Sequence, residues 1–155
     1  MLIQGKILSY GQDLSEIVTI RRKVFIEEMN IPEEVEFDEQ DAIAMHVVVY
    51  EEAGSRKAVA TGRIYFDGTD CEIGHIAVLK EFRQKKYGDF AVRMLLNKAF
   101  TAGITDVSVI SFAETEGFFE AIGFRKNSDI FLCNNHNYLS MSININNVLT
   151  ACKNK

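Results

Sequence analysis

The stretch from Cys71 to Phe100 constrains the fold more than any other part of the chain. It begins as a β-branched apolar run and crosses a short basic loop. From Gly88 it continues with the residue spacing of a helix, whose polar face carries Asp89 and Arg93. The pattern predicts a strand that delivers a cationic turn onto the N-terminus of a helix.

The loop between this strand and this helix has the chemistry of an anion site. It holds the residues Arg83, Gln84, Lys85 and Lys86. The unpaired N–H groups of a first helical turn and the positive end of the helix dipole add to these cations. The loop therefore predicts a site for a phosphate-bearing ligand. The alternative reading is a solvated basic turn that only connects the strand to the helix.

The composition of the chain limits what else it can be. With 155 residues, of which 47% are hydrophobic and 25% charged, the chain fits one globular domain. A net charge of −5 argues against a general nucleic-acid binder, because affinity for a phosphate backbone requires a basic surface. No apolar run approaches the roughly 20 residues of a membrane span, and the first residues lack the layout of a signal peptide. We therefore expect a cytoplasmic protein that binds neither nucleic acid nor membrane.

The cysteines and histidines do not indicate a disulfide framework or a metal centre. Cys71, Cys133 and Cys152 are widely spaced, odd in number and without a CxxC pair. His46 has no matching His or Cys nearby in the sequence, and we expect it to be packed or hydrogen-bonded at the start of a strand. No metal site is predicted.

The rest of the chain predicts strands and helices on both sides of this central unit. Further strands are expected at residues 2–10, 45–50, 58–66, 107–112, 125–133 and 138–145. Further helices are expected at residues 13–28 and 113–122. The residues after Asn146 are expected to form a tail.

An acidic segment follows the first predicted helix. Between Glu27 and Asp41 the chain carries eight acidic residues and no basic one. On composition alone, the segment is typical of a solvated acidic loop.

Two segments resemble the GNAT superfamily of acyl-CoA-dependent N-acyltransferases. Around the basic loop, Arg83, Lys86 and Gly88 occupy the marked positions of the family motif Arg/Gln-x-x-Gly-x-Gly/Ala, with Lys86 in place of the first glycine. The other segment is similar to the N-terminal signature of a bacterial, ElaA-like branch of the family, R-x-x-V-F-x-x-E-Q-x-x-P followed by E-x-D-x-x-D and a later His. Its matching positions are Arg21, Val24, Phe25, Glu28, Pro32, Glu36, Asp38, Asp41 and His46. Met29 stands in place of the usual Gln.

The resemblance covers about residues 13–141 and implies an α/β fold of the GNAT type. This fold is a mixed, mostly antiparallel sheet, splayed at the central strand, with helices on both faces. A single GNAT acetyltransferase domain is expected over residues 1–146, followed by a C-terminal tail over residues 147–155. In such enzymes the first helix and the loop after it wall the acceptor site, so the acidic segment would favour a cationic amine.

The resemblance also implies acetyl-CoA as the co-substrate and a set of residues that hold it. The N–H of Ile76 is a candidate donor to the acyl carbonyl, and Val78 would pair with the pantetheine amides like an added strand. The basic loop would receive the diphosphate, and the segment around Phe119 would close over the cofactor. The predicted cofactor-binding residues are Ile76, Val78, Arg83, Gln84, Lys85, Lys86, Tyr87, Gly88, Asp89 and Phe119.

For the chemistry, the resemblance implies a base and an acid. Glu72 stands where the family often has a strand glutamate that removes the proton of the amine. Phe119 replaces the tyrosine that commonly protonates the leaving thiolate, and Tyr138 on the last strand is the predicted acid in its place. The alternative readings are an exposed strand carboxylate for Glu72 and a packing aromatic for Tyr138.

Two histidines near these residues leave alternatives open. Alternation along a strand places Glu72 and His75 on opposite faces unless a bulge intervenes. In the branch resembled, a histidine occupies the position of Tyr138, and a short local shift of the chain would bring His136 there instead.

The function implied is transfer of an acetyl group from acetyl-CoA to the primary amine of a small molecule, by direct attack on the thioester. Two alternatives stay open: a degenerate GNAT domain that binds acyl-CoA without turnover, and an acyltransferase that uses a longer acyl donor. A homodimer is compatible with the sequence, which does not identify the amine.

Overall fold

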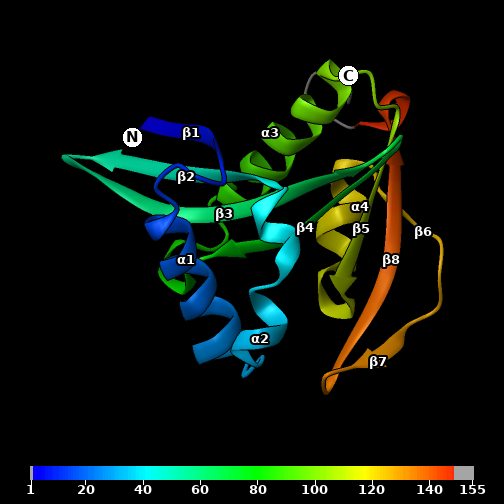
Figure 1. The fold of residues 1–155 in the computed structure, drawn as a ribbon, viewed down its shortest axis with the longest axis horizontal. Coiled ribbons are helices and arrows are strands. Elements are labelled where there is room, and N and C mark those ends of the chain that lie inside the picture. The colour runs from blue at the N-terminus through cyan, green and yellow to red at the C-terminus, as the bar shows by residue number, and fades with distance from the viewer. Residues whose placement is uncertain (1, 149–155) are drawn as a thin grey trace.

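The computed structural model describes residues 2–148, and its centre is a single mixed sheet (Figure 1). The strands are β1 (Leu2–Ser9), β2 (Met45–Ala53), β3 (Ser55–Asp67), β4 (Asp70–Val78), β5 (Asp106–Phe112), β6 (Arg125–Lys126), β7 (Phe131–Cys133) and β8 (His136–Asn144). The α-helices are α1 (Ser15–Arg21), α2 (Glu33–Glu36), α3 (Tyr87–Thr101) and α4 (Glu116–Ile122). A π-helix, η1 (Arg22–Glu28), continues α1 directly. Short 3-10 turns are η2 (Glu39–Ala42), η3 (Lys80–Phe82), η4 (Ala113–Thr115) and η5 (Ile145–Asn147).

The sheet opens at its centre. Its strand order is β1-β2-β3-β4-β5-β8-β6, with β7 also paired to β8, and only β4 and β5 run parallel. These two strands pair only at Glu72 with Ser108 and at Ile73 with Val109. Beyond that point β5 and β8 run steeply away from β2 and β3 (Figure 1). The predicted splay at the central strand is confirmed, and among residues 2–148 no strand pairs with this edge of β4 after Ile73.

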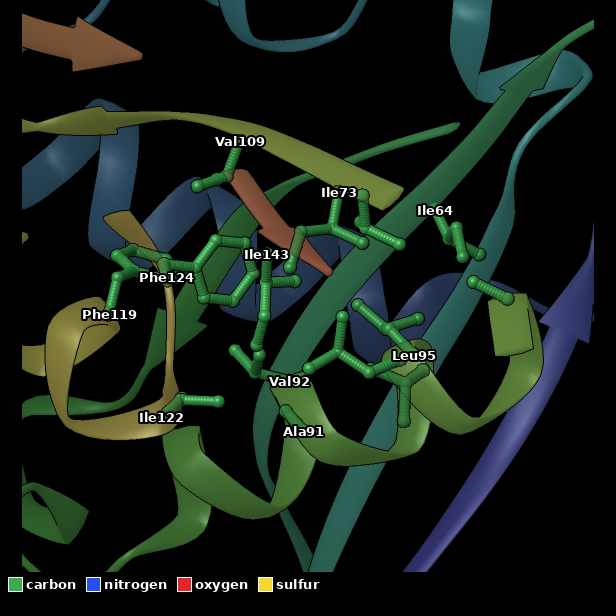
Figure 2. Packing of buried hydrophobic residues seen from close by; sticks show 14 of the residues in the cluster. Ile64, Ile73, Ala91, Val92, Leu95, Val109, Phe119, Ile122, Phe124 and Ile143 are labelled. Carbon is green, nitrogen blue, oxygen red and sulfur yellow. The ribbon is translucent and has the colours of Figure 1, made fainter. Parts of the chain in front are cut away.

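Helices cover both faces of the sheet, as the sequence predicts. Figure 1 shows α3 on one side of β1, β2 and β3, and α1 on the other side. The main core lies between the sheet and the helices α3 and α4, where Leu95 and Ile122 are fully buried (Figure 2). Two smaller apolar clusters lie under α1 and η1, one around Ile17 and one around Val24 and Phe25.

A β-bulge interrupts the regular alternation of β4. Opposite the interval from Thr61 to Arg63 of β3, β4 carries one extra residue. His75, within this bulge, has a φ of 51°. Before the bulge, Ile73 faces the main core, whereas Ala77 after it faces the cluster under η1. The extra residue therefore reverses the face to which odd-numbered side chains point.

Several predicted elements differ from the structure. The helix expected over residues 113–122 begins as the 3-10 turn η4 and becomes an α-helix at Glu116. The helix expected over residues 13–28 begins at Ser15 and changes from α to π geometry at Arg22. The strand expected over residues 125–133 is two short strands, because residues 127–130 leave the ladder with β8. β8 begins two residues earlier than predicted, since Asn134 and Asn135 alone form the preceding turn with φ values of 49° and 65°. Asparagine tolerates this left-handed conformation better than most residues.

The packed part of the chain extends to Val148, the second residue of the predicted tail. Val148 packs against the main core. A Cβ at Gly123 would lie 2.2 Å from the carbonyl oxygen of Asn147, and Gly123 has a φ of 130°. Only glycine allows α4 to end this close to η5. Residues 149–155 of the predicted tail lie outside the described residues.

Candidate active site

The bulge in β4 places Glu72 and His75 on the same face of the sheet, the face covered by α1 and η1. Glu72 points away from the main core because its neighbour Ile73 points into it. After the extra residue, His75 points the same way, and its ring packs edge-on against Phe25 of η1 at 6.1 Å between centroids. The expectation of opposite faces applies to a regular strand, and the bulge is the reason that it is wrong here.

A network of buried charges lies beside these two residues. Arg21, the last residue of α1, donates to Glu36 at 2.6 Å and to Asp41 at 2.8 Å. Arg63 of β3 donates to Asp38 at 2.7 Å and to Asp41 at 2.9 Å. Arg21 and Glu36 are only 2% and 3% exposed. Asp41 therefore joins the two arginines into one network that connects α1, β3 and the acidic segment.

This network changes the electrostatic interpretation of the acidic segment. Two guanidinium groups oppose the carboxylates of Glu36, Asp38 and Asp41, which leaves one net negative charge. Although burial alone would raise the pKa of Asp41, hydrogen bonds from Arg21 and Arg63 hold it below its ordinary value. The attraction for a cationic amine is therefore weaker than the number of acidic residues predicts.

Glu72 has the environment of a carboxylate suited to proton transfer. Burial raises the pKa of Glu72 above its ordinary value, while the charges of Arg63 and His75 oppose that rise. A carboxylate with a raised pKa accepts a proton more readily near neutral pH. Glu72 also pairs with Ser108 at the point where the sheet begins to splay.

His75 is held by a buried carboxylate. Its Nδ1 lies 2.8 Å from Oε2 of Glu36 and 3.3 Å from Nη2 of Arg21. Because an ionised carboxylate only accepts hydrogen bonds, the contact with Glu36 favours the form in which Nδ1 carries a proton, and in the neutral ring of that form Nε2 has the lone pair. The side chain of His75 is 20% exposed. His75 is therefore a second group on this face that can accept a proton.

Tyr138 lies in a row of aromatic rings on the same side of the molecule. Its ring stacks on Phe112 with centroids 4.8 Å apart and on Phe131 with centroids 6.1 Å apart. Burial, and then nearby negative charges that include Glu36, raise the pKa of Tyr138. The hydroxyl therefore keeps its proton at neutral pH and can donate it.

His136 makes a different contact. Its Nε2 lies 3.0 Å from the carbonyl oxygen of Met29, and its ring packs edge-on against Phe112. The β7–β8 hairpin pairs Phe131 directly with Tyr138. Tyr138 therefore occupies the position beside Phe112 that the alternative shift would give to His136, and His136 ties β8 to the end of η1.

The free edge of β4 presents backbone groups beside the splay. Leu79 donates its N–H to the carbonyl of Val59 on β3. Since backbone groups alternate along a strand, those of Val78 and Ile76 point to the other edge, which β5 has left. There the carbonyl of Val78 accepts a hydrogen bond from Nε of Arg83 at 3.0 Å. The geometry at Ile76 and Val78 suits the addition of an extended chain.

The basic loop folds tightly before α3. Gln84 and Lys86 have φ values of 63° and 69°, so that Lys86 adopts the left-handed conformation that a glycine would supply. Lys86 is the N-cap residue of α3, and its side chain makes no hydrogen bond to the first turn of the helix. Gly88 is needed for close packing, because a Cβ there would lie 3.3 Å from Val78 and 3.4 Å from Phe118. The loop therefore keeps the backbone shape of an anion-binding turn although it has only one of the motif's two glycines.

Two ion pairs modify the charge of this loop and helix. Arg83 donates from both terminal nitrogens to the two carboxylate oxygens of Glu28, at 2.7 and 2.8 Å, and this pair lowers the pKa of Glu28. Asp89, in the first turn of α3, accepts from Arg93 at 2.8 Å. The two lysines of the loop carry no ion pair in the part of the chain that the structure describes.

Two of the predicted cofactor-binding side chains lie in the core instead. Tyr87 and Phe119 are 2% and 3% exposed. The hydroxyl of Tyr87 donates to Glu51, and the ring of Phe119 packs edge-on against Phe124 (Figure 2). The predicted cofactor contacts of these two side chains are therefore not supported. The exposed ring beside the start of α3 is Phe118.

Sequence reasoning did not assign Arg63 or His75 to the site. Arg63 lies 25 residues from Asp38 and 22 from Asp41, and no local motif connects them. One signal was present, because Arg63 interrupts a predicted strand that is otherwise mostly apolar, and a buried charge requires a partner. No comparable signal predicts the bulge that turns His75 toward Glu36.

Other features of the described residues lie away from this site. A cavity of about 550 Å³ lies at the tip of the β2–β3 hairpin, and one of about 290 Å³ lies between β1 and α3. Within residues 2–148, no group of three or more His, Cys, Asp or Glu side chains is arranged to hold a metal ion. No helix among these residues is long and apolar enough to span a membrane.

Comparisons with known proteins identify the family and the fold of the chain. The profile of the acetyltransferase (GNAT) family matches residues 14–124. The Bacillus subtilis (strain 168) protein YyaT is 32% identical over 123 residues, which cover 77% of this chain and 81% of YyaT.

Two solved structures show the same fold at lower identity. Escherichia coli ElaA has a TM-score of 0.79 and 19% identity, over 92% of this chain and 99% of that chain. An acyl-CoA N-acyltransferase from Pseudomonas aeruginosa has a TM-score of 0.78 and 18% identity, over the same shares of the two chains. The predicted relation to the ElaA-like N-terminal signature stays a prediction, because this level of identity supports the fold alone.

Proposed function

Because the chain belongs to the acetyltransferase (GNAT) family, we propose that it transfers an acetyl group from acetyl-CoA to the primary amine of a small molecule. The proposal rests on three structural features that lie next to one another where β4 and β5 separate. The free edge of β4 lies between a cationic turn at the start of α3 and a face with two groups that can accept a proton, Glu72 and His75.

The residues at the splay fit the cofactor. Acetyl-CoA, when bound, supplies the acetyl thioester. Val78 and Ile76 offer backbone groups to an extended pantetheine chain, and the exposed lysines and first N–H groups of α3 suit a diphosphate. The packing of Gly88 against Val78 keeps the helix start close to this edge.

On the acceptor face, Glu72 takes the proton of the amine, directly or through a water molecule, so that the neutral amine can attack. The N–H of Ile76 donates to the carbonyl oxygen, on which negative charge develops. The hydroxyl of Tyr138 gives its proton to the leaving sulfur, and the resulting phenolate takes the second proton, which the nitrogen loses as the amide forms. No covalent bond between the acetyl group and the protein is needed in this sequence of steps.

A second candidate is a domain that binds acyl-CoA without turnover. Two observations favour it: Glu28 already neutralises Arg83, and Phe119 is a buried ring where the family commonly has an acidic hydroxyl. Release of several equivalents of CoA per protein molecule would reject this candidate. A panel of acetyl, butyryl and octanoyl donors tests, in the same assay, whether the enzyme prefers a longer acyl group.

The test combines binding and turnover. Calorimetric titration with acetyl-CoA should give saturable binding, which weakens in a Lys85→Ala, Lys86→Ala double variant. Thiol release with a panel of amines should then fall by about 10²–10⁴-fold in Glu72→Gln, because that change removes the general base. Absence of binding at millimolar acetyl-CoA would remove the assignment, and unchanged turnover in Glu72→Gln would remove Glu72 as the base.

A further inference from the structure

We infer that the acceptor is an amine carried on an aromatic or other apolar body, which lies on the ring row formed by Phe112, Tyr138 and Phe131. The inference rests on the proposed function, since it names the class of acceptor for the same site. It adds an apolar body to the cationic amine that the family resemblance implies for the acidic segment.

The ring row leads outward from the groups that can accept a proton. Phe25 packs edge-on against His75 at 6.1 Å and stacks with Phe112 at 6.2 Å between centroids. Phe112 stacks on Tyr138, which stacks on Phe131. The rings of Phe112, Tyr138 and Phe131 come from β5, β8 and β7, where they are directly paired across the strands. If the ammonium group of an amine lies near His75 and Glu72, the apolar part of the molecule can therefore lie against this row of rings.

The outer part of the ring row is open. Exposure increases from 3% at Phe25 to 41% at Phe131. Ile110, two residues before Phe112 on the same face of β5, is 50% exposed. The opposite face of β5 carries Val109 and packs in the main core with α4. A contiguous exposed apolar surface marks an interaction site, and here it adjoins buried polar groups that could hold the polar head of an apolar molecule.

The charges beside the ring row suit one ammonium group rather than several. The carboxylates of Glu36, Asp38 and Asp41 are paired with arginines and leave one net negative charge. Glu72 adds one carboxylate when ionised. Glu114, whose charge also reaches Tyr138, is exposed and screened by solvent. A polyamine would find few unpaired partners here, whereas one amine on an apolar body would use both the charge and the rings.

The experiment measures amine binding without turnover. The protein is saturated with CoA and titrated by calorimetry with 2-phenylethylamine, propylamine and spermidine. We expect 2-phenylethylamine to bind about tenfold more tightly than propylamine, because of the added ring contacts. Spermidine should gain no such advantage. Equal affinities for the three amines, or tightest binding of spermidine, would overturn the inference.

The adjacent residues Phe131 and Leu132 supply a matched pair of variants. Both are exposed, at 41% and 71%, but alternation along β7 turns Leu132 away from Tyr138. Phe131→Ala should weaken 2-phenylethylamine binding by about two- to tenfold and leave propylamine unchanged. Leu132→Ala should change neither. If Phe131→Ala instead dissociates a dimer and leaves both affinities unchanged, the ring row is a subunit contact and the inference is wrong.

The same amines in the thiol-release assay separate this inference from the proposed function. Preferential binding of 2-phenylethylamine without any acetyl transfer would reject the proposed function alone. Acetyl transfer to spermidine, with no preference for 2-phenylethylamine in binding or rate, would reject this inference alone.

Discussion

The two sides of the splay are built in different ways: one is the side proposed for the acyl donor, acetyl-CoA, and the other is the side proposed for the acceptor amine. The donor side is a contiguous loop, exposed from Arg83 to Lys86 and followed by the buried helix start at Tyr87 and Gly88, and its shape depends on local backbone conformation. The acceptor side is a buried network that gathers Arg21, Glu36 and Arg63 from distant parts of the chain. A site formed by consecutive residues can be recognised in a sequence. A site formed by residues that are distant in sequence can be recognised only in the folded structure.

The largest expected effect lies on the acceptor side. Arg21→Met leaves Glu36 buried without its cation, and we expect a loss of about 3–5 kcal/mol in the free energy of unfolding. Arg22→Met is the matched control, because Arg22 pairs with Glu33 on the surface, where such a pair contributes about 1 kcal/mol or less. Denaturant unfolding of both variants measures the difference. Equal losses would mean that burial does not distinguish the two pairs.

A second variant tests whether His75 supports the base. Asn is the suitable replacement because it tolerates the φ of 51° at this position. We expect His75→Asn to lower kcat/KM by about tenfold, which is less than the loss in Glu72→Gln, if Glu72 is the base and His75 only assists it. A larger loss in His75→Asn than in Glu72→Gln would reverse the two roles.

The pH profile of the wild type adds a third test of the acceptor side. Glu72 must be ionised to accept a proton, and burial raises its pKa above 4.5. The rate should therefore increase as pH increases through this raised pKa, and the acidic limb should disappear in Glu72→Gln. Persistence of the same limb in that variant would assign it to another group.

On the donor side the expected effects are smaller. Glu28→Gln removes the charge that pairs with Arg83, and we expect acetyl-CoA to bind up to about fivefold more tightly, the range of a surface ion pair. Glu27→Gln, at the preceding exposed position, should leave the affinity unchanged. Weaker binding in Glu28→Gln would instead indicate that Glu28 holds Arg83 in place for the cofactor.

An effect of similar size concerns the conformation of Lys86. Lys86→Gly and Lys86→Ala remove the same charge, but only glycine adopts a φ of 69° without strain. We expect the free energy of unfolding of Lys86→Gly to exceed that of Lys86→Ala by about 1 kcal/mol. Equal stability of the two variants would mean that the loop relaxes out of the left-handed conformation.

Much of the fold could be predicted, because it depends on periodic patterns and on a family resemblance. The GNAT fold, the splayed sheet and the helices on both faces are confirmed. The central strand, the basic loop and the helix after it also lie where the sequence predicts them. These features need only local alternation and helical spacing, which a single sequence records.

The site was harder to predict, because single-residue shifts decide it. One extra residue in β4 turns His75 to the face of Glu72, and no residue type there demands a bulge. In the seven-residue helix α4, Phe118 and Phe119 are adjacent and equally apolar, so that only the helix phase decides which of them is buried. The partners of Arg63 are set by tertiary contacts that no sequence spacing encodes.

The π-helix η1 has a consequence for how such chains change length. Arg21 precedes it and reaches the acceptor network, whereas Glu28 ends it and reaches Arg83 on the donor side. A π turn accommodates one residue more than an α turn. Deletion of one exposed residue, such as Lys23, would restore α geometry. Because the π turns already absorb the extra residue, the residues beyond it would stay on nearly the same face of the helix. A single-codon deletion at this place would thus leave both Arg21 and Glu28 facing their present partners, so that the chain can shorten here without loss of either ion pair.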